Sequence, residues 1–217
     1  MSETAQQERF TVFNQRPGAT VEAQSPLHHR YERDAATHGA GDAGVTLGEV
    51  RFLGHLSLRG NPDDEAFRSG CTRALGLELP TTPLTISRTE AISIQWISPD
   101  EWLVLVPGGN EHTAELDLRR HLDGHYSVVN VSGGQTLITL RGPHARDVLM
   151  KSAPYDLHPR NFPVDKGVLT VFAKASANIR RAGEDEWELI VRRTFADYIW
   201  GWLCDAATEY GLALQAP

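Results

Sequence analysis

The stretch Leu58-Arg59-Gly60-Asn61-Pro62 closes a predicted strand and opens a predicted helix, and it recurs as Leu140-Arg141-Gly142-Pro143. The offset between the two glycines is 142 − 60 = 82 residues. A second motif follows each copy, as Glu101-Trp102 and Glu186-Trp187, at an offset of 186 − 101 = 85 residues. Two motifs that recur in the same order predict an internal repeat. The alternative, two unrelated units, would leave both matches to chance.

The elements around the first copy follow a simple order. Residues 50–58 read as a strand, and Asn61 reads as the N-cap of a helix that Gly76 ends. Residues 91–97 and 101–106 read as the two strands of a hairpin. An amphipathic helix over residues 111–122 completes the unit.

The second copy repeats this order. Residues 136–142 form the strand, and Pro143 opens the helix. Residues 168–173, 177–180 and 186–191 are further predicted strands. The sequence thus predicts an α+β fold of two tandem pseudo-repeated β-α-β-β-α units, at about residues 45–131 and 132–217. Each unit leaves one sheet face uncovered, so we expect the units to share a core within one domain, 45–217.

The last helix has the clearest helical period. We expect Thr194 and Asp197 to form a capping box at its start and Gly211 to end it. Trp200 lies off the predicted inward stripe, so it would cover the other unit or meet a partner chain. The predicted stripe consists of Phe195, Tyr198, Ile199, Trp202, Leu203, Ala206, Ala207 and Tyr210.

Residues 1–44 read as an N-terminal arm and loop, polar and without a sustained period. Within the arm, residues 25–31 carry apolar and aromatic side chains that could anchor it on another surface. We therefore predict a subunit interface formed by Leu27, His28, His29, Tyr31 and Trp200.

Composition excludes several classes of protein. With 28 acidic and 21 basic residues, the net charge is −7, which is the opposite of the balance expected for a nucleic-acid binder. The N-terminus lacks an apolar secretory core, and we expect a cytoplasmic protein. Cys71 and Cys204 lie on or near apolar helix faces, which predicts buried thiols without a catalytic role.

A search for chemistry nominates no catalytic, cofactor-binding or metal-binding residue. Residues 39–44 satisfy the dinucleotide pattern G-x-G-x-x-G, but a strand and not a helix is predicted to follow them. Ser132-Gly133-Gly134-Gln135 precedes a strand and reads as a tight turn, not as a phosphate cradle. His28 and His29 lack nearby carboxylate or thiol ligands, and an interface or surface pair is the favoured interpretation.

Taken together, these features resemble the gamma subunit of bacterial heterotetrameric sarcosine oxidase. The resemblance rests on Ser25-Pro26-Leu27, on Leu140-Arg141-Gly142-Pro143-His144 and on the Trp200-Gly201-Trp202 region. It extends over roughly residues 25–211 and includes residues 102–107, 131–134, 156–159 and 193–203. It implies a fold like that of the glycine-cleavage aminomethyltransferase.

The resemblance also implies a function. The chain would be a non-catalytic subunit beside alpha, beta and delta subunits, in a complex that demethylates sarcosine to glycine. The one-carbon unit would pass to tetrahydrofolate, and oxygen would give hydrogen peroxide. FAD, FMN, NAD and zinc would all lie on the partner subunits.

Two alternatives stay open. The chain could be a stand-alone folate-binding or aminomethyltransferase-like module. It could also be a gamma-like subunit of a related dehydrogenase that acts on N-methylglutamate or dimethylglycine.

Overall fold

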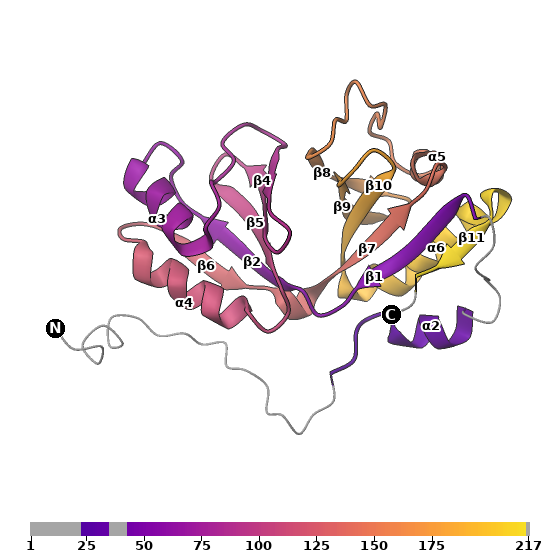
Figure 1. Ribbon diagram of the computed structural model, residues 1–217, viewed down its shortest axis with the longest axis horizontal. Coiled ribbons are helices and arrows are strands. Elements are labelled where there is room, and N and C mark those ends of the chain that lie inside the picture. Colours follow the sequence, from indigo (N-terminus) through magenta and orange to yellow (C-terminus); the bar gives the residue numbers. More distant parts are fainter. Residues whose placement is uncertain (1–22, 35–42, 216–217) are drawn as a thin grey trace.

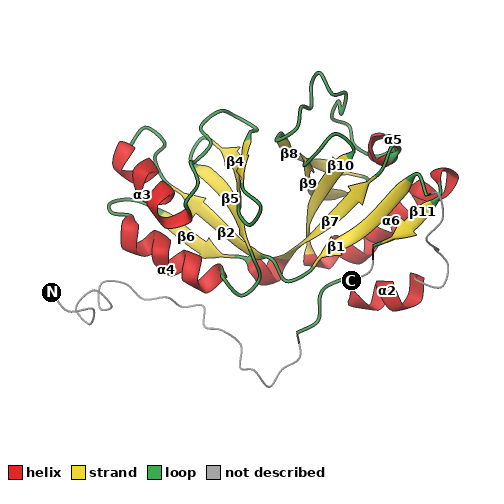
Figure 2. Cartoon of the chain, viewed as in Figure 1, coloured by secondary structure: helices red, strands yellow, loops and turns green. Residues whose placement is uncertain are grey.

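The strands of the protein form two sheets that face each other, with the helices on their outer sides (Figure 1, Figure 2). The computed structural model describes residues 23–34 and 43–215. The first sheet has the order β3 (Ile86–Arg88), β4 (Ser93–Ser98), β5 (Glu101–Val106), β2 (Gly54–Arg59), β6 (Ser127–Asn130). Helices α3 (Glu65–Leu75) and α4 (Glu111–His121) pack on it.

The second sheet has six strands. Its order is β11 (Leu212–Leu214), β1 (Val45–Val50), β7 (Gln135–Arg141), β10 (Glu186–Arg192), β9 (Ala175–Arg181), β8 (Gly167–Phe172). Helices α5 (Ala145–Met150) and α6 (Ala196–Ala207) cover its outer face, and the short helix α2 (His28–Asp34) lies beside α6 (Figure 1).

The two sheets have corresponding strand orders. The series β3-β4-β5-β2-β6 corresponds to β8-β9-β10-β7-β11, except that β1 is inserted between β7 and β11. Residues 45–50, which we assigned to the first repeat, instead form strand β1 of the second sheet, antiparallel to β7. The correspondence supports duplication of one unit, which stays a prediction.

The two sequence motifs occupy the same register in the two sheets. Trp102 lies opposite Leu58 across β5 and β2, and Trp187 lies opposite Leu140 across β10 and β7. The turns agree as well. The amide of Gly60 donates to the Asp100 carbonyl (3.1 Å), and the amide of Gly142 donates to the Asp185 carbonyl (3.0 Å).

The predicted strand 50–58 is wrong, because it spans two strands in different sheets. Strand β1 ends at Val50, and β2 begins at Gly54. Between them Phe52 has φ of 58°, a left-handed conformation that is uncommon for a residue with a side chain. This residue turns the chain from one sheet to the other, and hydrophobic patterning carries no signal for such a turn.

The predicted N-cap of the first helix is also wrong. Helix α3 begins later, at Glu65, and its N-cap is Asp64, whose carboxylate accepts from the Ala66 amide at 2.9 Å. Asn61 instead accepts from the Asp63 amide and shapes the turn before the helix. The expected end is confirmed, since Gly76 is the left-handed C-cap.

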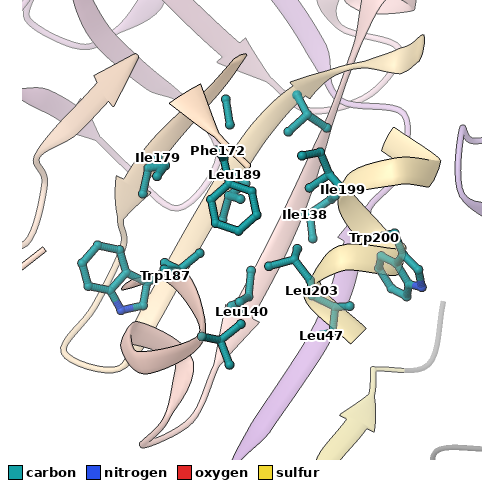
Figure 3. Packing of buried hydrophobic residues seen from close by; sticks show 14 of the residues in the cluster. Leu47, Ile138, Leu140, Phe172, Ile179, Trp187, Leu189, Ile199, Trp200 and Leu203 are labelled. Carbon is teal, nitrogen blue, oxygen red and sulfur yellow. The ribbon is translucent and has the colours of Figure 1, made fainter. Parts of the chain in front are cut away.

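The buried side chains form two main cores and a small third one. The larger core lies between the second sheet and α6, where Ile138 and Leu189 face Ile199 and Leu203 (Figure 3). Farther along the same core, Trp187 packs against Phe162, with 5.2 Å between ring centroids. A separate core lies between the first sheet and its two helices. The shared core that we expected is limited to a cluster between the sheets, formed by Leu103, Leu105, Leu137 and Ile190. Polar side chains occupy much of the remaining contact between the sheets.

Candidate functional site

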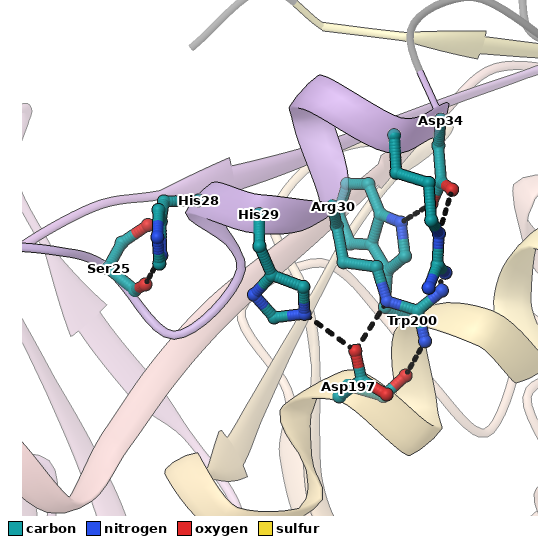
Figure 4. A network of polar contacts seen from close by, with 8 residues as sticks. Ser25, His28, His29, Arg30, Asp34, Asp197 and Trp200 are labelled. Atoms are coloured by element: carbon teal, nitrogen blue, oxygen red, sulfur yellow. Dashed lines mark hydrogen bonds and ion pairs between the residues drawn. The ribbon is translucent and has the colours of Figure 1, made fainter.

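The N-terminal segment 23–34 packs on its own chain, against α6 and β1. Leu27 is completely buried in the core of the second half. The Tyr31 ring packs against the Trp200 indole, with 5.3 Å between centroids. The indole Nε1 donates to the Asp34 carboxylate at 3.0 Å (Figure 4). Helix α2 is therefore held by apolar packing and by a buried hydrogen bond.

A charged pair fixes the outer side of this helix. The Arg30 guanidinium donates to the Asp197 carboxylate and, at 2.9 Å, to the Asp197 carbonyl (Figure 4). The His29 Nε2 lies 2.8 Å from the same carboxylate. Hydrogen bonds from Arg30 and His29 hold the pKa of Asp197 below its usual value. The expected capping box is wrong, because Asp197 receives these side chains and α6 has no side-chain cap.

A buried carboxylate connects the segment to the second sheet. The Glu49 side chain on β1 is fully buried and accepts from the Ser25 hydroxyl (2.6 Å) and the Thr136 hydroxyl (2.7 Å). The Glu49 amide also donates to the Tyr31 hydroxyl. Two hydroxyl donors and a nearby Arg51, at 3.9 Å, offset the cost of burying the charge.

The structure brings together the five predicted interface residues but buries three of them. Leu27, Tyr31 and Trp200 face the interior, and Trp200 packs against Tyr31 of α2 instead of covering the other unit. His28 is half-buried, with its Nδ1 3.0 Å from the Ser25 carbonyl, and His29 is exposed. An interface at this position stays a prediction, and it would be presented by the outer side of α2.

The stripe that we expected to face inward is only partly buried: Ile199, Leu203 and Ala207 lie in the core, whereas its large aromatic side chains before and on α6 face outward. Tyr198 and Trp202 on α6 are 37% and 41% exposed, and their rings lie 6.1 Å apart. Phe195 before the helix and Met150 on α5 are also exposed. Large aromatic and methionine side chains are enriched in interface cores, so this face is a further candidate contact surface.

The open space between the two sheets is a cleft of about 650 Å³. Asn178 on β9 lines the cleft and exchanges two side-chain amide hydrogen bonds of 2.8 Å with the buried Gln95 on β4. One wall contains Leu169 on the edge strand β8, which is 62% exposed. The volume suits a small molecule or a short peptide segment, and the lining is both apolar and polar.

A buried charged cluster joins the sheets beside the cleft. The Arg180 guanidinium on β9 donates to the Ser93 hydroxyl on β4 at 2.9 Å and lies 3.0 Å from the Glu188 carboxylate. Arg88 on β3 lies within ion-pair distance of Asp165 and Glu188. Burial lowers the pKa of Arg180 to about 10, so the group stays charged at neutral pH.

One histidine is buried where the two halves meet. The His55 side chain on β2 is almost fully buried, and its Nδ1 lies 3.0 Å from the Leu53 carbonyl. Because a carbonyl only accepts, the proton is on Nδ1, and Nε2 carries a lone pair. Burial lowers the pKa of His55 to about 4, so the ring is neutral at physiological pH.

The described residues include both cysteines, the Ser132–Gly134 turn and the end of the glycine-rich segment. Cys71 is buried as expected, whereas Cys204 is only half-buried. Burial nevertheless raises the pKa of both thiols to about 12, which argues against thiolate chemistry. Ser132–Gly134 forms a 3-10 turn that leads directly into β7, as predicted. Residues 39–42 of the glycine pattern lie outside the described residues, but a strand follows Gly44 as expected.

Residues 23–34 and 43–215 contain neither a metal-binding cluster nor a membrane-spanning helix. No cluster of three or more histidine, cysteine, aspartate or glutamate side chains is placed there to bind a metal. In the same residues, no helix has the length and apolar character needed to cross a bilayer.

The arrangement of two facing sheets defines the class of fold to which the chain belongs. The chain superposes on aminomethyltransferase T of the glycine cleavage system from Bartonella henselae with a TM-score of 0.63, over 87% of this chain and 58% of that one. At 16% identity this likeness shows the fold alone. It confirms the expected α+β, aminomethyltransferase-like fold. An aminomethyltransferase from Bacillus licheniformis is 35% identical over 98 residues, 44% of this chain and 27% of that protein.

The chain belongs to the sarcosine oxidase gamma subunit family, whose profile matches residues 59–209. It is 33% identical over 193 residues to the sarcosine oxidase subunit gamma of Corynebacterium sp. (strain P-1), covering 88% of this chain and 93% of the relative. The Arthrobacter sp. subunit gamma is 33% identical over 188 residues, 86% of this chain and 90% of the relative. The resemblance found in the sequence is thereby confirmed.

A solved structure extends the likeness. The chain superposes on a chain of the heterotetrameric sarcosine oxidase from Corynebacterium sp. U-96, in complex with pyrrole 2-carboxylate, with a TM-score of 0.79 and 30% identity. The match covers 89% of this chain and 99% of that one.

Proposed function

We propose that the protein is the gamma subunit of a heterotetrameric sarcosine oxidase, a non-catalytic chain that supports assembly with alpha, beta and delta subunits. The observation that carries the proposal is the match to a chain of such an oxidase over 99% of that chain's length. The outward aromatic face of α6 offers a surface on which a partner subunit could pack. A cytoplasmic location is part of the same proposal.

The chemistry of the complex follows from the family resemblance. The assembly would oxidise the N-methyl group of sarcosine, yield glycine, pass the one-carbon unit to tetrahydrofolate and reduce oxygen to hydrogen peroxide. FAD, FMN, NAD and zinc would be bound by the partner subunits. This chain would contribute shape and contact area, and no step of the reaction is assigned to its side chains.

A reconstitution tests the proposal. The three partner chains are produced with and without this chain, and assembled complex and sarcosine-dependent hydrogen peroxide are measured. We expect the four-chain preparation to assemble and turn over, and the isolated chain to be colourless and inactive. Equal assembly and turnover in both preparations would contradict the subunit role. If the complex oxidised N-methylglutamate or dimethylglycine in place of sarcosine, this chain would still be a subunit of the complex, but the complex would have a different substrate.

A further inference from the structure

The two halves meet through contacts that are equivalent under the internal correspondence. The offset of 85 that relates Glu101 to Glu186 also relates Ser93 to Asn178 and Gln95 to Arg180, since 178 − 93 = 180 − 95 = 85. The observed contacts are Ser93 with Arg180 and Gln95 with Asn178. Each contact is thus the counterpart of the other, and the two sheets face each other as the subunits of a two-fold dimer would.

His55 breaks this symmetry at the centre of the contact. The offset of 82 between β2 and β7 relates His55 to Leu137, since 137 − 55 = 82. Leu137 lies in the apolar cluster between the sheets, whereas His55 is 1% exposed and its Nε2 has no hydrogen-bond partner among the described residues. An unpaired buried acceptor is destabilising, so a leucine would be the more stable residue here for packing alone.

A small cavity adjoins the histidine. It has a volume of about 90 Å³ and is lined by His55, Gln135 and Gly133, among others. The Gln135 Oε1 is a second buried acceptor without a partner. The nearby Ser132 hydroxyl already donates to the Asn130 side chain at 2.6 Å and accepts from the His55 amide at 3.0 Å. Neither acceptor is satisfied by a described side chain.

The glycine in the wall is not required by the backbone. Gly133 has no positive φ, and a Cβ added to it would meet no atom within 4 Å. The chain could therefore accommodate a side chain there without strain. Gly133 is exposed and lines both this cavity and the larger cleft between the sheets.

We propose that this cavity binds a small hydrogen-bond donor, of the size of water or ammonium, which donates to His55 Nε2 and Gln135 Oε1. The volume of about 90 Å³ is sufficient for a molecule of this size, since a cavity needs only about 10–15 Å³ to hold a water. His55 belongs to the first sheet and Gln135 to the second, so the bound molecule connects the two halves. This inference concerns the chain itself and does not depend on the proposed function.

Nitrogen NMR on the full chain tests the site. The His55 Nε2 resonance is recorded at pH 7, alone and during titration with ammonium chloride, with sodium chloride as the control for ionic strength. A resonance shifted by hydrogen bonding before any addition assigns the occupant as water. A saturable shift with ammonium, absent with sodium, assigns a cationic N–H donor. A resonance typical of a free lone pair that responds to neither salt would overturn the proposal.

A variant supplies the second readout. His55→Leu copies the counterpart Leu137 and should therefore fold. In this variant we expect the side-chain amide signal of Gln135 to change position and to lose any response to ammonium. An unchanged position and response of the Gln135 signal would show that His55 does not take part in the site.

Discussion

At the scale of single residues, burial decides the state of the ionisable groups. His55 is neutral because the interior disfavours its charged form, whereas Arg180 stays charged beside Glu188. The sequence contains nine histidines and offers no sign that His55 differs from the others. Its environment depends on the meeting of two sheets that are distant along the chain, which local patterning does not describe.

The depressed pKa of His55 predicts a specific pH dependence. The folded chain binds a proton at about pH 4 and the unfolded chain near 6.5, so stability is complete above pH 6.5 and falls as pH drops toward 4. The loss from this residue should be about 3 kcal/mol. Urea unfolding of wild type and His55→Leu at pH 7 and pH 4.5 measures it. The variant should be less sensitive to acid, and an equal sensitivity would contradict the assignment.

Two neighbouring tryptophans give a second prediction at this scale. Trp200→Phe removes the indole hydrogen bond to Asp34 in the core and should cost about 1–3 kcal/mol of unfolding free energy. Trp202→Phe, on the exposed side of the same helix, is the matched control and should cost less than about 1 kcal/mol. Chemical denaturation measures the unfolding free energy of both variants. A larger loss for the Trp202 variant would mean that α6 buries a different face from the one described.

At the scale of elements, the sequence predicts most strands and helices but not which face of α6 is buried. The helix carries apolar side chains on more than one face: Ile199 and Leu203 face the sheet, Trp200 faces α2, and Trp202 faces outward. Helical periodicity selects an apolar stripe. It does not show that a segment far away in the chain covers a neighbouring stripe. The docking of α2 decides the orientation, and it depends on tertiary contacts alone.

The structure makes the N-terminal segment part of the core, which can be tested with Leu27. Leu27→Ala removes a completely buried side chain and should lower the unfolding free energy by about 2–5 kcal/mol. Leu169→Ala, on an exposed edge strand, is the control and should change stability by no more than about 0.5 kcal/mol. If both variants changed the unfolding free energy by similarly small amounts, the N-terminal segment would not unfold cooperatively with the rest of the domain.

At the scale of the whole molecule, the repeated motifs predict two similar units, and the structure explains why they do not merge into one core. Each sheet packs its helices on one face and meets the other sheet through a face that carries amides, arginines and carboxylates. Strand β1 crosses from the first half into the second sheet and ties the halves together. The sequence shows the repeats but not this exchange, since strand pairing is non-local.

The amide pair between the sheets predicts a non-additive effect. Gln95→Leu leaves the buried Asn178 side chain without its partner and should cost about 1–3 kcal/mol. The double variant with Asn178→Leu should recover much of this loss, because two apolar groups replace two paired polar ones. Urea unfolding of the wild type, both single variants and the double variant completes the cycle. Additive losses would mean that the amides do not act as a pair.

The central claim is that this chain works as one subunit of an oxidase. The direct measurement is native mass spectrometry of the full chain, tagged and purified from the cells that make it, combined with an absorption spectrum. The account predicts a complex with three other polypeptides, flavin absorbance and sarcosine-dependent hydrogen peroxide. A colourless chain that elutes alone, or with partners that bear no flavin, would contradict it.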